Sequence, residues 1–551
     1  MSKGIFQKIQ DFDANFLRVT GFEQLVIFFR DNKALLIFLS IIAVIAYGGD
    51  VFNFSLNIDS ENHAFDYGAK GGWVSQGRWG MYFLNSMLLP DAIMPVIPML
   101  IAIVGSVIGA LFFVQTLSPI RGIADYLAAP IAIACPVIYF AFYFTTLGYG
   151  VGIAFAVTGY GMYMLTRWKW SGAIIAAFCF CFGMGIYQAV LPLIAVIFCL
   201  YLVASVIEED HLTAPVFIKR NIIFVLVMGL AYALYEAIKY ISLRYMEIAF
   251  DSGYMSGFVS YKPTWEYFSA TLEKTFPIAV NYYTGGKSYY LYDLVVLKIL
   301  FPLTFCASIV AIVRSNNSWL VRVLAVLALL FAIAAPMLMH ILNSGYMPPR
   351  TVFGVPQVLA GMVYFTMLNR SKMLQSITAI LAIACIYKFC VINNRYAFSN
   401  AMVWQADRDL SLQLQQKIAD VLPKIAPSKD HHAGYPIELV GWVEYAETPI
   451  FVQREVIGAS FYKWAAGDVE RVERLFRTMA VTNYRAATQA ERLSVVEKAK
   501  LMPDWPYEGS VDVINGVIVI KFREYNPNQF LSMCRPPMDT DPVCLANSPA
   551  N

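Results

Sequence analysis

Residues 34–50 read ALLIFLSIIAVIAYGGD, and this stretch decides the class of fold. It contains no charged side chain before Asp50. A bilayer core about 30 Å thick needs roughly 20 residues of apolar helix to cross it. The stretch therefore predicts a membrane-spanning helix that ends near Asp50.

Similar apolar stretches recur along the chain as far as residue 393. Measured against that length, they predict about eleven transmembrane helices. One apolar run is too long for a single helix, and Gly183, Gly185 and Gln188 offer the break between two spans. The expected spans centre on 34–50, 92–117, 128–144, 149–166, 172–186, 189–207, 221–243, 291–313, 322–342, 353–369 and 373–393.

The composition agrees with a membrane protein. The 551 residues are 58% hydrophobic and 14% charged, whereas soluble globular chains are about 45–50% apolar and about 25% charged. The mean hydropathy is +0.56. A net charge of +3 is too small to indicate a nucleic-acid partner.

The basic residues predict the orientation. Short connections after alternate spans carry Lys and Arg, on the same side as the basic N-terminal segment, and the positive-inside rule assigns that side to the cytoplasm. An odd number of spans then places the C-terminus in the periplasm of a bacterial inner membrane. The basic residues of these connections are Arg121, Arg167, Lys169, Lys219, Arg220, Arg314, Arg322, Arg370 and Lys372.

This topology predicts three parts. Residues 1–33 form a cytoplasmic N-terminal segment. Residues 34–393 form the transmembrane module, with long periplasmic loops at 51–91 and 244–290. Residues 394–551 read as a small periplasmic α/β domain. Its signals are helical spacing in Ala406–Val421, a capping box from Thr488 to Glu491, and alternation in Val511–Phe522 around the turn pair Asn515-Gly516.

The nine cysteines divide between two environments. Seven of the nine fall within apolar spans, where a small buried hydrophobe is the expected role. Cys534 and Cys544 lie in the C-terminal domain, which the topology places in an oxidising compartment. A disulfide between them is therefore predicted.

The first outer loop concentrates acids. Asp59, Glu61 and Asp66 all follow closely after the first span. If the segment is extended, Asp59 and Glu61 point to the same side, because residues two apart in a strand share a face. Two interpretations stay open at this point, namely a carboxylate pair for catalysis and the ordinary acidity of a water-exposed loop.

Aromatic and polar residues on the outer face suit a ligand and a membrane interface equally. Trp73 and Trp79 flank Arg78. Indole rings collect at headgroup depth, and an arginine there is able to hold a phosphate through two parallel hydrogen bonds. Tyr187-Gln188 stands at the helix break, where polar side chains also satisfy freed backbone groups.

Two further basic residues belong to the same face. Lys287 lies in the second long loop among tyrosines, a mixture that suits an anionic headgroup and a sugar ring as well as an ordinary interface. Arg350 follows Pro348 and Pro349. The two prolines fix the backbone, which reduces the entropy lost when the guanidinium is held in place.

Taken in order, these motifs resemble a known family. Asp-x-Glu at 59–61, Gly-Arg-Trp at 77–79, Tyr-Gln at 187–188 and Pro-Pro-Arg at 348–350 look like the Gtr family, the serotype-converting O-antigen glucosyltransferases of enteric bacteria and their phages. The resemblance covers roughly residues 30–400. It implies a GT-C type membrane glycosyltransferase that moves glucose from undecaprenyl-phosphate-glucose to the O-antigen repeats of lipopolysaccharide on the periplasmic face.

The resemblance also implies roles for residues. It ties catalysis to Asp59 and Glu61. An inverting transfer needs a base near the acceptor hydroxyl and positive charge where the departing phosphate becomes negative. Asp-x-Glu is able to hold Mg²⁺ or Mn²⁺, but arginines suffice for a monophosphate, so no metal cofactor is expected. The expected substrate-binding residues are Asp66, Arg78, Tyr187, Gln188, Lys287 and Arg350.

Other classes of membrane protein remain as alternatives. A lipid-linked sugar flippase or transporter predicts ionisable residues near the bilayer midplane, whereas Glu236, Lys239 and His340 are among the few in these spans and lie mostly near span ends. An O-antigen polymerase or ligase predicts its basic catalytic residues in a large outer loop late in the chain. A simple membrane anchor needs far fewer spans.

Overall fold

The computed structural model forms two compact units. The first comprises Met1–Phe52 and Gly68–Asn394, and the second comprises Asn53–Tyr67 and Arg395–Asn551. The segment after the first span therefore groups with the C-terminal part of the chain. The structure describes residues 22–61, 70–89, 95–118, 122–168, 170–250, 264–343, 345, 347–425, 434–481, 483–536 and 538–546.

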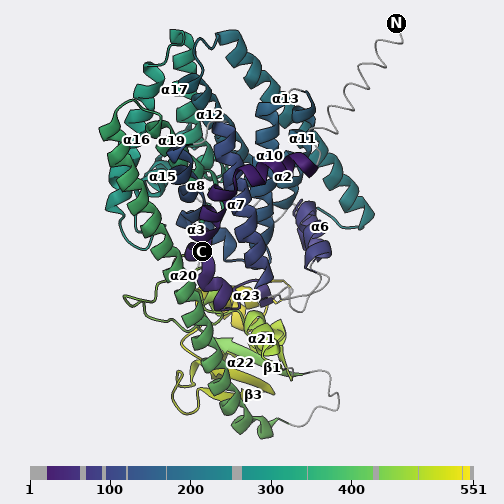
Figure 1. Ribbon diagram of the computed structural model, residues 1–551. Helices are drawn as coiled ribbons and strands as arrows, with labels where there is room; N and C mark the ends of the chain where they lie inside the picture. The colour runs from purple at the N-terminus through teal and green to yellow at the C-terminus, as the bar shows by residue number, and fades with distance from the viewer. Residues whose placement is uncertain are drawn as a thin grey trace. The chain divides into compact units, whose positions relative to one another are not determined.

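The first unit is helical (Figure 1). Its helices are α2 (Phe22–Asp31), α3 (Lys33–Phe52), α5 (Lys70–Ser75), α6 (Trp79–Leu88), α7 (Ile97–Leu117), α8 (Ile123–Ala134), α9 (Pro136–Phe142), α10 (Gly148–Arg167), α11 (Trp170–Ile186), α12 (Val190–Glu208), α13 (Ala214–Tyr245), α15 (Trp265–Thr284), α16 (Val295–Val313), α17 (Trp319–Ala334), η2 (Ala335–Met337), α18 (Leu338–Leu342), η3 (Pro349–Thr351), α19 (Gly354–Met367) and the first part of α20 (Lys372–Val421). The stretches expected as outer loops thus contain helices α5, α6 and α15.

Helix coincides with every one of the expected spans, but not all of these helices qualify as spans by length and composition. Among the described residues, seven are long and apolar enough to cross a membrane, and the bent pair α8–α9 makes up to eight. The remaining three are α10, which is rich in Gly and Tyr, and α11 and α19, which have 17 and 14 residues. The molecule is a helical membrane protein with seven or more candidate spans, and the count of eleven stays a prediction.

Glycines let α7 and α10 approach closely. A Cβ atom at Gly105 would overlap the backbone of Gly152 and would lie 2.8 Å from the Ile153 nitrogen. At Gly109 a Cβ atom would lie 2.8 Å from the carbonyl carbon of Phe155. Small residues allow helix backbones to pack tightly where lipid supplies no hydrophobic drive between helices. These glycines therefore fix the spacing of this helix pair.

Helix α20 is longer than the sequence predicts. It runs for 50 residues from Lys372 to Val421, and the division between the two units falls within it, after Asn394. The expected last span at 373–393 and the expected helix Ala406–Val421 are therefore one continuous element. Residues 394–405 contain neither Gly nor Pro, so nothing in this stretch interrupts the backbone hydrogen bonds.

The second unit contains a four-stranded sheet with the order β2-β1-β4-β3. Strand β1 runs parallel to β2 and to β4, and helices make these crossovers, whereas β3 and β4 form an antiparallel hairpin. The elements are β1 (Tyr435–Val440), α21 (Val469–Thr478), β2 (Tyr484–Ala486), α22 (Gln489–Lys500), β3 (Val511–Ile514), β4 (Val517–Lys521), α23 (Pro527–Met533) and α24 (Pro542–Ala546).

Local sequence signals in this unit are confirmed. Asn515 and Gly516 have φ values of 51° and 81°, as a two-residue hairpin turn of type I′ requires. Thr488 caps α22, and Glu491 returns a bond to the Thr488 backbone, which is the predicted capping box. Apolar residues of β1, β4 and α22, such as Val440, Val519 and Val495, form the core beneath the sheet.

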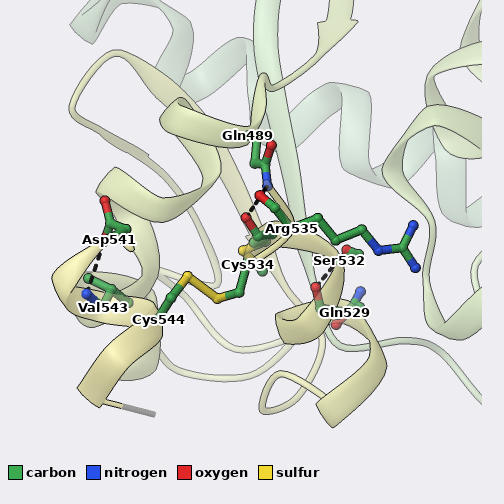
Figure 2. The surroundings of a disulfide bond; sticks show 9 residues. Gln489, Gln529, Ser532, Cys534, Arg535, Asp541, Val543 and Cys544 are labelled. Carbon is green, nitrogen blue, oxygen red and sulfur yellow. Dashed lines mark hydrogen bonds between the residues drawn. A yellow bond between two sulfur atoms is a disulfide. The ribbon is translucent and has the colours of Figure 1, made fainter. Parts of the chain in front are cut away.

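The predicted disulfide joins Cys534 and Cys544 (Figure 2). It links the end of α23 to α24, across 10 residues of chain. The Gln489 side chain of α22 donates to the carbonyl oxygens of Met533 and Arg535, the latter at 2.7 Å. These contacts attach the cross-linked segment to the helix beside it.

Candidate functional site

Two acids of the segment that follows α3 meet one arginine within the second unit. Arg471 lies on α21, which begins after the capping residue Asp468. Its Nη2 donates to Asp59 Oδ1 at 2.9 Å, and its Nη1 donates to Glu61 Oε1. The arginine therefore bridges the two carboxylates that the sequence singled out.

The backbone that presents these acids is a turn. The condition under which the sequence placed both acids on one face, an extended segment, is not met. Ser60 donates its backbone N–H to the Asn57 carbonyl at 3.0 Å, and Asp59 has a φ of 76°. A left-handed conformation is uncommon for residues other than glycine, although Asp tolerates it better than most. The two carboxylates are brought together by the guanidinium rather than by strand geometry.

Asp59 and Glu61 differ sharply in their surroundings. The Glu61 side chain is 0% exposed, whereas that of Asp59 is 43% exposed. Burial raises the pKa of Glu61 to about 7, and the charge of Arg471 opposes the rise. Glu61 Oε2 accepts no hydrogen bond within the described part of the chain. Of the two acids, Asp59 is the one whose carboxylate is exposed to solvent.

Sequence reasoning missed Arg471. It lies 412 positions after Asp59, in a region where the motif resemblance had already ended. Arginine is common on the surface of helices, and α21 also carries Arg474 and Arg477. No local signal distinguishes Arg471 from them, so only the fold identifies it.

A second group forms within the first unit. Arg78 lies over the ring of Tyr187, with 5.0 Å from its Cζ to the ring centroid, and over the ring of Trp73 at 5.5 Å. Its Nε also lies 3.5 Å from Gln188 Oε1. The structure thus unites the Gly-Arg-Trp motif with the Tyr-Gln motif, 110 positions away.

Gln188 holds this group together. Its Nε2 donates to the Gln76 carbonyl at 2.8 Å and lies 3.2 Å from the Tyr235 hydroxyl. The acceptor is thus a carbonyl of the turn between α5 and α6, not a freed carbonyl of the break between α11 and α12. Gln188 therefore positions Arg78 and does not serve to satisfy a freed backbone group of the helix break.

The other expected binding residues stand on different elements. Arg350 lies on η3, and its Cζ is 5.1 Å from the centroid of the Phe144 ring. Lys287 follows α15 with an exposed side chain, and its backbone N–H donates to Asp293 at 3.2 Å. Asp66 lies outside the described residues.

A further carboxylate in the first unit, that of Asp50, belongs to none of the sequence motifs. Asp50, near the end of α3, accepts a 2.8 Å hydrogen bond from the Tyr139 hydroxyl of α9. Helix α9 also contacts η3, the turn that carries Arg350. The signal in the sequence that could have singled out Asp50 is its position as the first acid at the end of the apolar stretch.

Within the residues that the structure describes, no three His, Cys, Asp or Glu side chains are grouped to hold a metal ion. Between Asp59 and Glu61, the position that a bridging cation would take is filled by the Arg471 guanidinium.

Comparison with known proteins identifies the family. Neither the curated proteins nor the solved structures give a match to this chain. The family model described as "Glucosyl transferase GtrII" matches residues 50–368, which is more than half of the chain. The match includes both acids of the first loop and the Arg78 group, and it ends before Arg471. The chain is therefore a glycosyltransferase that belongs to the glucosyl transferase GtrII family.

Proposed function

We propose that this membrane glucosyltransferase takes glucose from undecaprenyl-phosphate-glucose and adds it to O-antigen repeat units of lipopolysaccharide. The observation that carries the proposal is the family match on a chain with seven or more candidate spans. A transferase embedded in lipid suits a donor whose polyprenyl tail is itself held in the bilayer, because that tail cannot leave hydrocarbon cheaply. The motif resemblance supports the O-antigen acceptor.

Asp59 is the general base in this proposal. The acceptor hydroxyl attacks the anomeric carbon while its proton passes to the Asp59 carboxylate. The bond from the anomeric carbon to the phosphate oxygen breaks, its electron pair stays with undecaprenyl phosphate, and the configuration inverts. The 43% exposure of Asp59 leaves it accessible to a hydroxyl. Buried Glu61 acts through Arg471 and holds the guanidinium that orients Asp59.

The arginines of the first unit bind the lipid phosphate in this proposal. Arg78 is held between the rings of Trp73 and Tyr187, and this fixes the plane of its guanidinium before a phosphate arrives. Arg350 follows two prolines, which have the same effect on its backbone. Preorganised positive charge stabilises a leaving group as it becomes negative. Lys287, Gln188 and Asp66 complete the proposed binding set.

In this proposal the reaction takes place on the periplasmic face of the bacterial inner membrane. Alternate connections rich in Lys and Arg support a cytoplasmic N-terminus. The Cys534–Cys544 disulfide supports an oxidising compartment for the C-terminal part, because such bonds form and persist there. Under this topology, residues 394–551 act as a periplasmic domain.

The test is transfer of labelled glucose from polyprenyl-phosphate-glucose to O-antigen in membranes with matched protein levels. Asp59→Asn keeps the size of the side chain and removes its basicity, so we expect a loss of at least about a hundredfold. Glu61→Gln should lose less. Asp512→Asn, which removes a carboxylate paired with Lys424, is the matched control. Wild-type rates in both Asp59→Asn and Glu61→Gln would move the base elsewhere.

A further inference from the structure

The second unit contains a cavity of about 430 Å³. Its lining comes from one segment, residues 453–465, and includes Gln453, Glu455 and Trp464. Sites for small molecules usually enclose about 300–1,000 Å³, with a few polar groups placed to fix the orientation of the ligand. The cavity has the size and composition of a binding site. Arg471, Asp59 and Glu61 are not among its lining residues.

The backbone of this segment is strained around the cavity. Glu455, Ala465 and Ala466 have φ values of 51°, 50° and 64°. Each such residue costs about 1–3 kcal/mol and persists only where the surrounding structure enforces it. Strain of this kind collects at ligand-binding and active sites. The grouping of these strained residues in one segment indicates that the surrounding structure holds the cavity in this shape.

Buried hydrogen bonds enforce that conformation. The Asp407 carboxylate of α20 accepts from the Ser460 hydroxyl at 2.7 Å and from the Phe461 backbone N–H at 2.8 Å. Asn400, seven residues before Asp407 on the same helix, accepts from the Gly458 N–H at 2.8 Å. The segment is thus fastened to a long helix at several points, and the cavity is formed before any ligand enters.

The lining chemistry matches a neutral sugar. Trp464 offers half-buried indole surface to the apolar C–H face of a pyranose ring. The Lys463 ammonium pairs with Glu444 at 2.8 Å and donates to Gln453 at 3.0 Å, so its charge is compensated. Glu455 adds an exposed carboxylate that suits ring hydroxyls, whereas the Ser460 hydroxyl is engaged with Asp407 and the Gln453 amide with Tyr445 and Lys463. With no net positive charge left over, the lining is poorly suited to a phosphate.

We infer that this cavity is a glycan-binding site that holds part of the acceptor polysaccharide away from the reacting hydroxyl. The identity of the glycan as the acceptor rests on the proposed function. A repeating polysaccharide offers many equivalent units, and holding one unit raises the effective concentration of its neighbours at the site of transfer. The C-terminal part of the chain thereby has a role in substrate capture.

The test is a binding titration. The purified full chain in detergent is titrated with fluorescently labelled O-antigen polysaccharide freed of its lipid anchor, and the dissociation constant is measured. Trp464→Ala should weaken binding by at least about tenfold, because buried tryptophans dominate the energy of such contacts. Trp464→Phe keeps an aromatic face and should retain part of the affinity. Trp442→Ala is the matched control, since Trp442 lies outside the cavity lining and stacks with Arg523 at 4.5 Å.

Transfer kinetics separate this inference from the proposed function. Trp464→Ala should raise KM for the polysaccharide about tenfold and leave kcat near the wild-type value, and Asp59→Asn should bind the polysaccharide normally. Equal binding by the wild type, Trp464→Ala and Trp464→Phe would overturn the glycan site, as would displacement of the polysaccharide by inorganic phosphate or anionic vesicles. Binding through Trp464 by a wild-type protein that transfers no glucose would overturn the proposed function alone.

Discussion

Arg471 on α21 is paired with Glu61, a fully buried carboxylate 410 positions earlier in the chain. The same guanidinium reaches the half-exposed Asp59 through its other terminal nitrogen. A buried charge that loses its partner is strongly destabilising, because the carboxylate cannot regain its water. The pairing therefore carries consequences for stability as well as for catalysis.

Removal of this arginine should weaken the second unit. We expect Arg471→Ala to lower the free energy of unfolding by about 1–3 kcal/mol at neutral pH, because Glu61, with a pKa of about 7, takes up a proton once its partner is lost. Arg471→Lys should recover only part of it, because an ammonium is a point charge and does not form the planar fork between two carboxylates. Thermal and denaturant unfolding in detergent provides the measurement. Arg474→Ala is the control, whose surface pair with Glu470 is worth about 0–1 kcal/mol; equal losses in both variants would contradict the prediction.

Glu61 should make stability depend on pH. Burial raises its pKa from 4.5 to about 7, so the folded state binds the proton more tightly than the unfolded chain does. Its contribution to stability is therefore greatest below about pH 4.5 and declines as the pH rises to about 7. Glu61→Gln cannot titrate and should flatten this part of the profile. Melting temperatures of both proteins from pH 4.5 to 8 test this, and parallel profiles would show that Glu61 titrates as it does in the unfolded chain.

The contact between α7 and α10 should not tolerate a methyl group. Gly105→Ala places a Cβ atom against the backbone of Gly152, which has no side chain to move aside. Overpacking of this kind typically costs about 1–3 kcal/mol, and we expect a lower melting temperature and less folded protein in membranes. Gly229→Ala on α13 is the control, since a Cβ atom there meets nothing within 4 Å. Unchanged melting of Gly105→Ala would mean that the two helices lie further apart.

The Cys534–Cys544 bond should contribute modestly to stability. It closes a loop of only 10 residues that also contains prolines, so its effect on the unfolded chain should be below about 3 kcal/mol. The double variant Cys534→Ala, Cys544→Ala should still fold, with a lower melting temperature. Mass spectrometry of the non-reduced protein checks the bond directly, and two free thiols at these positions would refute it.

Cysteine labelling checks the proposed topology. In a variant without the native free cysteines, Glu508→Cys should react with an impermeant maleimide in intact spheroplasts. Ser318→Cys, at the start of α17, should react only after permeabilisation. Both positions are exposed, so access is decided by the membrane. Labelling of both from one side would mean that the number of spans between them has the wrong parity.

Several elements were predictable because their causes are local. The apolar stretch at 34–50 gives α3 directly, since its length matches the bilayer core. The turn pair Asn515-Gly516 and the Thr488 capping box depend on a few adjacent residues, and both formed as predicted. The motifs around Asp59 and Arg78 were sufficient to indicate the family that the model over residues 50–368 confirms.

Tertiary structure decided the rest, because the interactions join residues that no local pattern connects. The pairing of Asp59 and Glu61 depends on Arg471, more than 400 positions away, and the segment that presents the two acids is a turn. The approach of Arg78 to Gln188 depends on how α5, α6, α11 and α12 pack. Helix α20 is one element where two helices were expected, since periodicity cannot tell one long helix from two short ones without a breaker between them. Sequence alone determined the apolar stretches that form the candidate membrane spans and indicated the family, whereas packing determined which charges face one another.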